Sequence, residues 1–377
     1  MRIAIVQPRT SYHIAGSEKV SLKHAEFLAK LGHTVDLYTS TSKKIKESSL
    51  FKEFVDRKLL GINILRFDIS RLIPNLYDEK PDREHKRWIK ESMAFDREIY
   101  SNLEKSKPDI ILSYYLPDSI FKPPDIPNVL YISGYPTYPI PWYKLLMRSC
   151  DATISISSTV SEKWKAELQE VKLNYVLGTG VDYPINIKSQ IVPRAKCNLV
   201  YAGRLIERKG ILTLLDAFKK ITETNKDIHL WVLGKGELEA TLQKKISTLG
   251  LKKKVTLTGL VTNPYDYFAM ADICVFPSHR GDGLMGTVLE SMAVGKPVIT
   301  TTDNGNEDVI ANGKNGILIK PEDREVLVSA IENLIKDKTK RKILGEQAQQ
   351  FIAKNITWER NIERLSEIFV DIVNKTR

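Results

Sequence analysis

Short apolar runs alternate with amphipathic stretches along almost the whole chain, and this alternation constrains the fold more than any other feature of the sequence. Residues 2–8 (RIAIVQP) form one apolar run, and in residues 16–32 the apolar side chains recur at helical spacing up to Gly32. Strands that are joined through helices lie in the same direction, because the helix carries the chain back to the end of the sheet where the first strand began, and such crossovers are right-handed. The pattern therefore predicts an α/β fold with largely parallel sheets.

The apolar runs fall into two series. The first comprises residues 2–8, 33–40, 62–69, 109–115, 128–133 and 151–157, and the second comprises 197–205, 228–234, 255–261, 272–278, 296–303 and 315–321. The stretch between the two series, residues 180–197, contains two prolines and has no clear period, which is typical of a linker. A chain of 377 residues also exceeds the usual size of a single core.

We therefore predict two Rossmann-like domains, at residues 1–180 and 195–357. The last segment, residues 358–377, has the pattern of an amphipathic helix, and the pattern alone allows it to pack on either domain. In such sheets, ligands bind beyond the carboxyl ends of the strands. The loops that follow the strands are thus the places to look for functional residues.

The net charge of +11 raises the question of a nucleic-acid partner. The basic residues are spread along the chain, without an RNA-binding signature or a zinc-finger spacing, so no nucleic-acid partner is expected. The densest basic stretch, residues 43–58, is interleaved with acids and serines. Two interpretations of it stay open: a solvated face, or attraction to an anionic surface such as phospholipid headgroups or a phosphorylated acceptor.

Cysteine usage and hydropathy bear on the compartment. Three widely spaced cysteines without a CxxC pair indicate a reducing compartment, with no disulfide framework and no zinc site. The apolar stretch at the N-terminus is too short for a signal peptide, and no run of about 18 apolar residues occurs. We expect a cytoplasmic protein, with peripheral contact to the inner face of the membrane as a second expectation from the basic stretch.

Two loops have the residues that phosphate groups need. Gly16 and Ser17 begin a helix whose first amides lack partners within the helix, and a glycine there lets an anion approach closely. Arg204 stands at the end of the strand at 197–205, and Lys209 follows five residues later, before a helix. A planar guanidinium beside an ammonium group suits a diphosphate. The alternatives are a simple turn at Gly16 and surface salt bridging by the two cations.

A third loop, VLGKGELEATL, resembles the dinucleotide fingerprint but ends in Glu239, so the fingerprint is incomplete. We interpret its Gly234 as a turn that lines a base pocket. A nicotinamide site at this loop is disfavoured by the missing last glycine.

The fourth loop places Asp282 among glycines and Glu290 eight residues later. We expect a helix from Thr287 onward, so that Gly286 and Thr287 present free amides and Glu290 lies in the first turn, where the helix dipole favours a carboxylate. A carboxylate also accepts two hydrogen bonds from a vicinal diol such as a ribose. The alternatives are helix-start electrostatics for Glu290 and turn formation for Asp282. Together, the four loops predict a site for a nucleoside diphosphate between the two domains.

These residues resemble the family 4 retaining glycosyltransferases of the GT-B fold, also described as glycosyl transferases group 1. Over residues 198–367, the motifs VYAGRLIERKG, VLGKGELEATL, DGLMGTVLESMAVGKPVITT and NEDVIANGKNGILIKPED stand in the family's order. The first half resembles the family more thinly, through AGSEKVSLKHAEFLAKLGHTVDLYT, DATISISSTVSEKW and GTGVD. The resemblance implies two Rossmann-like domains that face each other across a deep cleft, with residues 358–377 returning to the first domain.

The resemblance also implies roles for individual residues. Residues 1–180 would bind the acceptor, and residues 195–357 would bind the donor. The family's paired acids fall on Asp282, for hydroxyls of the transferred sugar, and on Glu290, for the ribose. The implied catalytic residues are Arg204, Lys209 and Asp282, and the implied donor-binding residues are Gly16, Ser17, Gly234, Gly283, Leu284, Met285, Gly286, Thr287 and Glu290.

The implied activity is transfer of a hexose-type sugar, with retention, from a UDP- or GDP-linked donor to a hydroxyl acceptor. Such a site needs no metal ion and no cofactor, because cations and helix amides stabilise the leaving diphosphate. The acceptor would be a cell-envelope or lipid-linked glycan, in keeping with the basic stretch at 43–58.

The sequence departs from the family's pattern at two places. The first acid is usually Glu, and Asp282 is one methylene shorter. The family's histidine after the strand at 128–133 is absent, and Ser133 followed by Gly134 stands there. We assign Ser133 and His13 to the acceptor side, with simple exposure as the alternative for His13.

Three other functions stay open. A non-catalytic subunit that binds a nucleotide sugar would tolerate both departures. A GT-B nucleotide-sugar 2-epimerase would use the same donor site. An NAD(P)-dependent oxidoreductase would need a complete glycine fingerprint after the first strand, which the sequence lacks.

Overall fold

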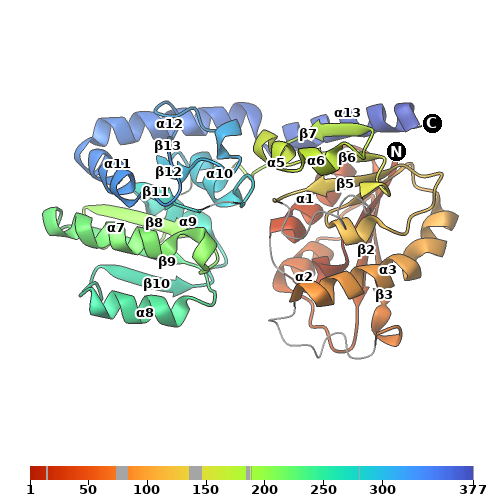
Figure 1. Ribbon diagram of the computed structural model, residues 1–377, viewed down its shortest axis with the longest axis horizontal. Coiled ribbons are helices and arrows are strands. Elements are labelled where there is room, and N and C mark those ends of the chain that lie inside the picture. Colours follow the sequence, from red (N-terminus) through yellow and green to blue (C-terminus); the bar gives the residue numbers. More distant parts are fainter. Residues whose placement is uncertain are drawn as a thin grey trace. The chain divides into compact units, whose positions relative to one another are not determined.

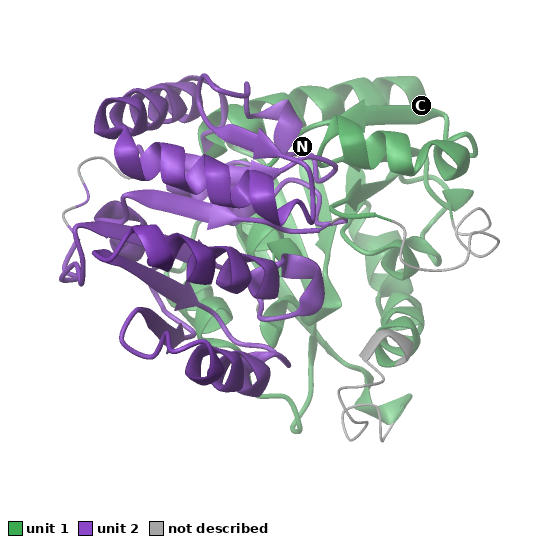
Figure 2. Ribbon diagram, turned by 60° about the vertical axis from the view of Figure 1, so that its left-hand side comes forward, with its two compact units in different colours: residues 1–179, 358–377 green, residues 180–357 purple. Residues whose placement is uncertain are grey.

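The computed structural model of this chain describes residues 1–13, 16–73, 84–135, 147–183, 187, 189–279 and 281–376. They form two compact units, Met1–Thr179 with Trp358–Arg377 (unit 1) and Gly180–Thr357 (unit 2), which Figure 2 shows in two colours. Each unit contains a parallel sheet with helices around it (Figure 1). The predicted α/β class with two Rossmann-like domains is therefore confirmed.

The described residues of unit 1 form a seven-stranded sheet in the order β3-β2-β1-β4-β5-β6-β7. The strands are β1 (Arg2–Val6), β2 (Thr34–Thr41), β3 (Ile62–Asp68), β4 (Ile110–Ser113), β5 (Asn128–Ile132), β6 (Ala152–Ser155) and β7 (Leu173–Val176). The central strands are buried along nearly their whole length, as expected for parallel strands that are covered on both faces. The order of the strands reverses direction between β1 and β4.

Helices follow most of these strands. In the described part of unit 1, the α-helices are α1 (Gly16–Lys30), α2 (Ser49–Asp56), α3 (Glu84–Ser106), α5 (Ser158–Lys163), α6 (Lys165–Leu168) and α13 (Trp358–Thr376), and the 3₁₀ turns are η1 (Pro8–Ser11), η2 (Ile69–Arg71) and η5 (Leu116–Ser119). Two of the helices begin at serine caps: Ser48 accepts from the Phe51 amide, and Ser157 accepts from the Val160 amide.

The C-terminal helix α13 packs on unit 1. The Trp358 ring lies 5.9 Å from the ring of His24 and 6.2 Å from that of Phe27, both on α1. Further along α13, Ser366 Oγ lies 2.9 Å from His33 Nε2, and Asp371 accepts a hydrogen bond from the Tyr175 hydroxyl. These contacts confirm the expected return of the C-terminal helix to the first domain.

The described residues of unit 2 form a six-stranded sheet in the order β10-β9-β8-β11-β12-β13. The strands are β8 (Cys197–Ala202), β9 (Ile228–Leu233), β10 (Val255–Gly259), β11 (Ile273–Phe276), β12 (Val298–Thr301) and β13 (Ile317–Ile319). Each lies inside one of the apolar runs of the second series. Strand β8 pairs with β9 on one side and with β11 on the other, so the chain again reverses its direction across the sheet beside β8.

The helices of unit 2 pack their apolar faces on this sheet and on one another. They are α7 (Ile211–Thr224), α8 (Glu239–Thr248), α9 (Pro264–Met270), α10 (Gly286–Ala293), α11 (Arg324–Lys336) and α12 (Lys338–Asn355), with 3₁₀ turns η6 (Glu207–Lys209) and η7 (Asn306–Asp308). The buried core of the unit includes Leu199 and Leu230 from the sheet and Phe218 and Ile331 from helices. Burying a side chain of this kind stabilises the fold by about 1.5–3 kcal/mol.

Within the described part of the chain, no helix combines the length and the apolar character that crossing a membrane would need.

Candidate functional site

Two loops meet at the carboxyl edge of the sheet in unit 2. Strands β8 and β11 are parallel neighbours, so the loops that follow them leave the same edge. The His279 amide donates to the Arg208 carbonyl at 2.8 Å, which ties one loop to the other. Gly210 makes the close approach possible: its φ is 66°, and a Cβ there would lie 1.9 Å from the Pro277 carbonyl oxygen.

Asp282 lies between two cations at this edge. Lys209 Nζ is 2.9 Å from Asp282 Oδ2, and Arg208 Nη1 forms an ion pair with Oδ1. The Asp282 side chain is only 2% exposed. The ammonium group of Lys209 is close to Oδ2 but is not aligned with it as a hydrogen-bond donor. The carboxylate is therefore neutralised by Lys209, which was predicted to hold a diphosphate, and by Arg208, which was not.

The cations at this edge also repel one another. Burial, reinforced by the charges of Arg208 and Arg204, lowers the pKa of Lys209 to about 7. Burial and Arg204 likewise lower the pKa of Arg208. Arg204 itself is exposed, directly after β8. An anion that bound here would relieve this repulsion, so the edge has the electrostatic character of a phosphate site.

The first turn of α10 presents amides at the same edge. Helix α10 begins at Gly286, one residue earlier than predicted, and the Val288 and Leu289 amides donate to the Met285 carbonyl. Among the described residues, no acceptor is bonded to the amides of Gly286 or Thr287. Two unbonded amides at the start of a helix are suited to an anion, and this helix follows the loop that carries Asp282 and its cations.

Glu290 does not lie in the first turn, and that expectation was wrong. Because α10 begins at Gly286, Glu290 is its fifth residue and gains less from the helix dipole. Its side chain is buried, with 7% of the residue exposed. Glu290 lies close enough to Tyr265 that its charge adds to the effect of burial and raises the pKa of that phenol. The Tyr265 hydroxyl donates to the Asp182 carbonyl at 3.3 Å.

The other donor-side residues of unit 2 surround these groups. Gly283 has a φ of 62°, which explains the glycine, and Leu284 and Met285 are buried. Gly234 has a φ of 125°, and a Cβ there would lie 2.0 Å from the Gly203 carbonyl oxygen. Packing of the loops after β8 and β9 therefore accounts for Gly234 without a ligand.

The remaining predicted residues lie on unit 1. Gly16 is the exposed first residue of α1, and the Ser17 hydroxyl donates to Glu18 at 3.0 Å. Glu18 is a buried carboxylate in the first turn of α1, and it reduces the pull of that helix end on a phosphate. His13 packs edge-on against Trp88, with ring centroids 5.5 Å apart.

Ser133 follows β5 and is half-buried. Among the described residues, no hydrogen bond, ion pair or ring contact joins Ser133 to His13.

Sequence reasoning missed three residues at the edge of unit 2. Arg208, which holds Asp282, stands directly before Lys209 in the same motif. Asn304 and Asn306 follow β12, the strand next to β11, and their side chains bond to the loop that carries Asp282. The rule that pointed to the loops after β8 and β11 applies equally to the loop after β12, and it could have found both asparagines.

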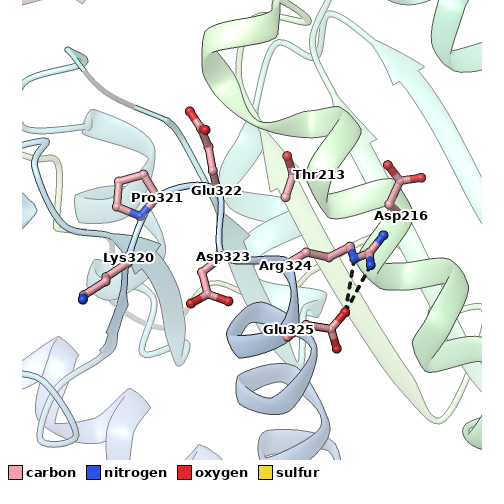
Figure 3. Close-up of a pocket in the computed structure, with 8 residues that line it drawn as sticks. All are labelled: Thr213, Asp216, Lys320, Pro321, Glu322, Asp323, Arg324 and Glu325. Atoms are coloured by element: carbon pink, nitrogen blue, oxygen red, sulfur yellow. Dashed lines mark hydrogen bonds and ion pairs between the residues drawn. The ribbon is translucent and has the colours of Figure 1, made fainter.

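A shallow hollow of about 630 Å³ in unit 2 does not coincide with this edge (Figure 3). It lies between α7 and the start of α11, and it is lined by Thr213, Asp216, Lys320, Pro321, Glu322, Asp323, Arg324 and Glu325. Its charged side chains are largely paired with one another or with neighbours, as Arg324 is with Glu325. The hollow therefore has the features of a solvated surface and not those of the predicted donor site.

Comparison with known proteins finds a family-model match in unit 2. Residues 184–351 match the family model described as "Glycosyl transferases group 1". An uncharacterized glycosyltransferase of Methanocaldococcus jannaschii is 31% identical over 182 residues, which cover 48% of this chain and 46% of that protein. The chain thus spans about half the length of that relative. The lipopolysaccharide core biosynthesis glycosyltransferase LpsE of Rhizobium meliloti is 27% identical over 260 residues, 68% of this chain and 74% of LpsE.

Solved structures resemble the chain over nearly its whole length. Sucrose-phosphate synthase from Thermosynechococcus elongatus has a TM-score of 0.79 at 17% identity, with 99% of both chains covered. Anabaena HepE in complex with UDP has a TM-score of 0.74 at 15% identity, with 98% of this chain and 100% of HepE covered. At such identities the likeness concerns the fold. The chain has the GT-B fold, and its residues 184–351 match the model of the glycosyl transferases group 1 family.

Proposed function

We propose that this protein is a retaining glycosyltransferase that moves a hexose-type sugar from a UDP- or GDP-linked donor to a hydroxyl of a cell-envelope or lipid-linked glycan. The observation that carries the proposal is the pairing of Arg208 and Lys209 with Asp282, with Arg204 close enough to lower the pKa of both cations, on the loops that lead to the free amides of α10. The match of residues 184–351 to a glycosyltransferase family model supports it. No cofactor is proposed besides the donor.

The charges at this edge match the needs of the reaction. In the transition state, negative charge builds up on the leaving diphosphate, and fixed cations and amides stabilise it most where water is scarce. With Lys209 protonated, three cations and one carboxylate leave two positive charges for the diphosphate. In the front-face displacement that we propose, the bond from the anomeric carbon to the diphosphate breaks as the acceptor oxygen attacks from the same side. The departing phosphate oxygen takes the acceptor's proton.

Asp282 requires a rearrangement in this mechanism. Its carboxylate is paired with Arg208 and Lys209, whereas the proposed role is to bind hydroxyls of the transferred sugar. A bound diphosphate would compete for Lys209 and release one carboxylate oxygen toward the sugar. Glu290 would bind the ribose.

The relatives support the proposed acceptor class. They include LpsE and a capsular polysaccharide biosynthesis glycosyltransferase, CapM of Staphylococcus aureus, which is 30% identical over 42% of this chain. The peripheral membrane contact has weaker support. One basic residue of the stretch, Arg57, is already paired with Glu26, and an acid of the stretch, Glu47, is paired with Arg66. Four lysines of the stretch are exposed: Lys43, Lys46, Lys52 and Lys58.

Two variants with opposite expected effects test the proposal. Arg204→Ala removes a cation that faces solvent, so we expect the fold to be kept, UDP or GDP to bind more weakly and transfer to fall on the order of 100- to 1000-fold. Asp282→Asn removes the internal counter-charge, so the nucleotide should bind at least as tightly as before, while transfer is lost. A screen of nucleotide sugars for thermal stabilisation identifies the donor for these assays.

The outcomes separate the proposal from its alternatives. Near-normal transfer by Arg204→Ala would reject the assigned role of the cluster. Binding of a nucleotide sugar without release of nucleotide, with or without acceptors, would favour a non-catalytic subunit. An epimerised donor would favour the 2-epimerase, and turnover of NAD(P)H would favour the oxidoreductase.

A further inference from the structure

Two fully buried asparagines follow strand β12 in unit 2. Asn304 and Asn306 have no exposed surface. The amide nitrogen of Asn304 lies 2.9 Å from Thr301 Oγ1 and 3.2 Å from the Thr302 carbonyl oxygen. The amide nitrogen of Asn306 lies 3.2 Å from Thr300 Oγ1. Both side chains are thus anchored to the end of β12.

The carbonyl oxygens of the same two side chains point to the loop that follows β11. Asn304 Oδ1 accepts from the Asp282 amide at 3.2 Å, and Asn306 Oδ1 accepts from the Met285 amide at 3.4 Å. The two bonds hold opposite ends of one short segment. One end carries the Asp282 carboxylate, and the other directly precedes the first turn of α10.

The segment needs such support, because its backbone is unusual. Gly281 and Gly283, on either side of Asp282, have φ values of 85° and 62°. Glycine adopts this region readily, but it also leaves the chain free to adopt others. Hydrogen bonds from a rigid strand end remove that freedom, so the loop is fixed before a ligand arrives.

The chemistry explains why asparagine stands at both positions. Each buried side chain must accept a hydrogen bond from the loop after β11 and donate one to the end of β12. A primary amide does both without carrying a charge. An aspartate could accept but not donate, and it would place an uncompensated charge in the interior. An alanine would leave the Asp282 or Met285 amide without its partner.

We propose that Asn304 and Asn306 are positioning residues with separate effects. Asn304 fixes Asp282, and it therefore affects how much the sugar adds to donor affinity and how fast the sugar is transferred. Asn306 fixes the start of α10 and so governs binding of the diphosphate to the Gly286 and Thr287 amides. This inference rests on the proposed function, because it divides the donor site between the two asparagines.

The experiment compares Asn304→Ala and Asn306→Ala with a matched control. Asn315 is also buried in unit 2, and it also bridges a loop: it accepts from the Ala311 amide at 2.8 Å and donates to the Val309 carbonyl at 3.0 Å. Asn315→Ala therefore reports the general cost of losing a buried asparagine. The probes are UDP and GDP, with UDP-glucose, UDP-N-acetylglucosamine and GDP-mannose as donors, and the best-binding donor is used throughout.

The readouts are the affinity for the free nucleotide, the ratio of donor affinity to nucleotide affinity, and the rate of nucleotide release from the donor. For Asn304→Ala we expect nucleotide affinity close to that of the unsubstituted protein, with the ratio and the release rate reduced by roughly three- to tenfold. For Asn306→Ala we expect nucleotide affinity to fall by roughly three- to tenfold while the ratio is kept. For Asn315→Ala, none of the three readouts should change, although the melting temperature should fall as it does in the Asn304→Ala and Asn306→Ala variants.

Several results would overturn the inference. Equal effects of the two variants on both affinities would do so, and so would equal losses in Asn315→Ala. If Asn304→Ala does not fold, Asn304→Ser replaces it, because serine is small and uncharged and can still accept a hydrogen bond, and the ratio should fall in the same direction by less. Failure of the unsubstituted protein to bind any of the five ligands would reject the proposed function and this inference with it. If the unsubstituted protein binds a ligand and the Asn304 and Asn306 variants bind it with the same affinities, the inference alone would be rejected.

Discussion

At the level of single residues, the candidate site holds one carboxylate and three cations, and their charges affect the protonation of Lys209. Lys209 is held between a carboxylate, Asp282, and two other cations. Burial and those cations favour loss of its proton, and Asp282 opposes that loss. Because the pKa of Lys209 lies near 7, its charge depends on what else is bound.

This balance predicts that nucleotide binding depends on pH above neutrality. The folded protein without ligand loses the Lys209 proton as the pH rises through about 7. A bound diphosphate favours the charged form, so the protein must take up a proton on binding. We expect the affinity for UDP to be greatest below pH 7 and to fall by up to about tenfold per pH unit between pH 7 and 9.

Titration calorimetry in two buffers with different heats of ionisation measures this proton uptake directly. In Lys209→Arg the charge is permanent, so the uptake and the pH dependence should both disappear. Binding of UDP at pH 8 without proton uptake would show that Lys209 keeps its charge or does not face the diphosphate.

Individual site residues could be read from the sequence only in part. Asp282, Arg204 and Lys209 belong to recognisable patterns at the ends of strands. The pairing of Asp282 with Arg208 was not predictable, because it depends on the backbone turn at Gly281–Gly283 and on a side-chain direction. Asn304 and Asn306 have no local pattern, and their importance arises only when β12 lies beside β11.

At the scale of the element, the strands and helices were largely evident in the sequence, since apolar runs and helical spacing mark them. Their ends were less evident. The start of α10 is displaced by one residue from the expected Thr287, and this displacement moves Glu290 out of the first turn. The cause is tertiary: Asn306 holds the Met285 amide, so the helix begins directly after it.

The start of α10 gives a prediction that separates ligand contact from folding. A Cβ built at Gly286 meets no heavy atom within 4 Å, and the residue has helical backbone geometry. Gly286→Ala should therefore leave the melting temperature unchanged or slightly raised. If a diphosphate approaches the Gly286 amide, the added methyl group should weaken UDP binding by roughly tenfold, or about 1.4 kcal/mol.

Gly234→Ala is the contrasting variant. Its Cβ would collide with the Gly203 carbonyl oxygen, so any loss of UDP binding should come with a loss of thermal stability. The two properties are measured by thermal unfolding and titration calorimetry. Unchanged UDP affinity in a stable Gly286→Ala protein would place the diphosphate elsewhere.

At the scale of the whole molecule, unit 1 is built from both ends of the chain. His24 of α1 is fully buried, and its Nδ1 atom lies 2.7 Å from the Tyr114 hydroxyl. The His24 ring also packs against Tyr131 from the sheet and against Trp358 of α13. The amphipathic pattern of residues 358–377 predicted the helix, but only the family resemblance predicted its place. Ring contacts between residues more than 300 positions apart leave no local signal.

The position of His24 predicts how the stability of unit 1 depends on acid. Burial lowers the pKa of His24 to about 3, although the side chain of Asn361 opposes the shift. The contribution of neutral His24 is therefore complete above its ordinary pKa of about 6.5 and is lost as the pH falls toward 3. Between pH 6.5 and 4.5 we expect the loss of this contribution to remove about 2 kcal/mol from the free energy of unfolding.

His24→Phe cannot bind a proton, so urea unfolding followed by tryptophan fluorescence should show a loss that is smaller by that amount over the same interval. His13→Phe changes a half-exposed ring of the same unit and should keep the pH dependence of the unsubstituted chain. If His24→Phe also kept it, the acid sensitivity of this unit would have to come from other groups whose pKa falls on folding, such as His33, whose pKa is also lowered by burial.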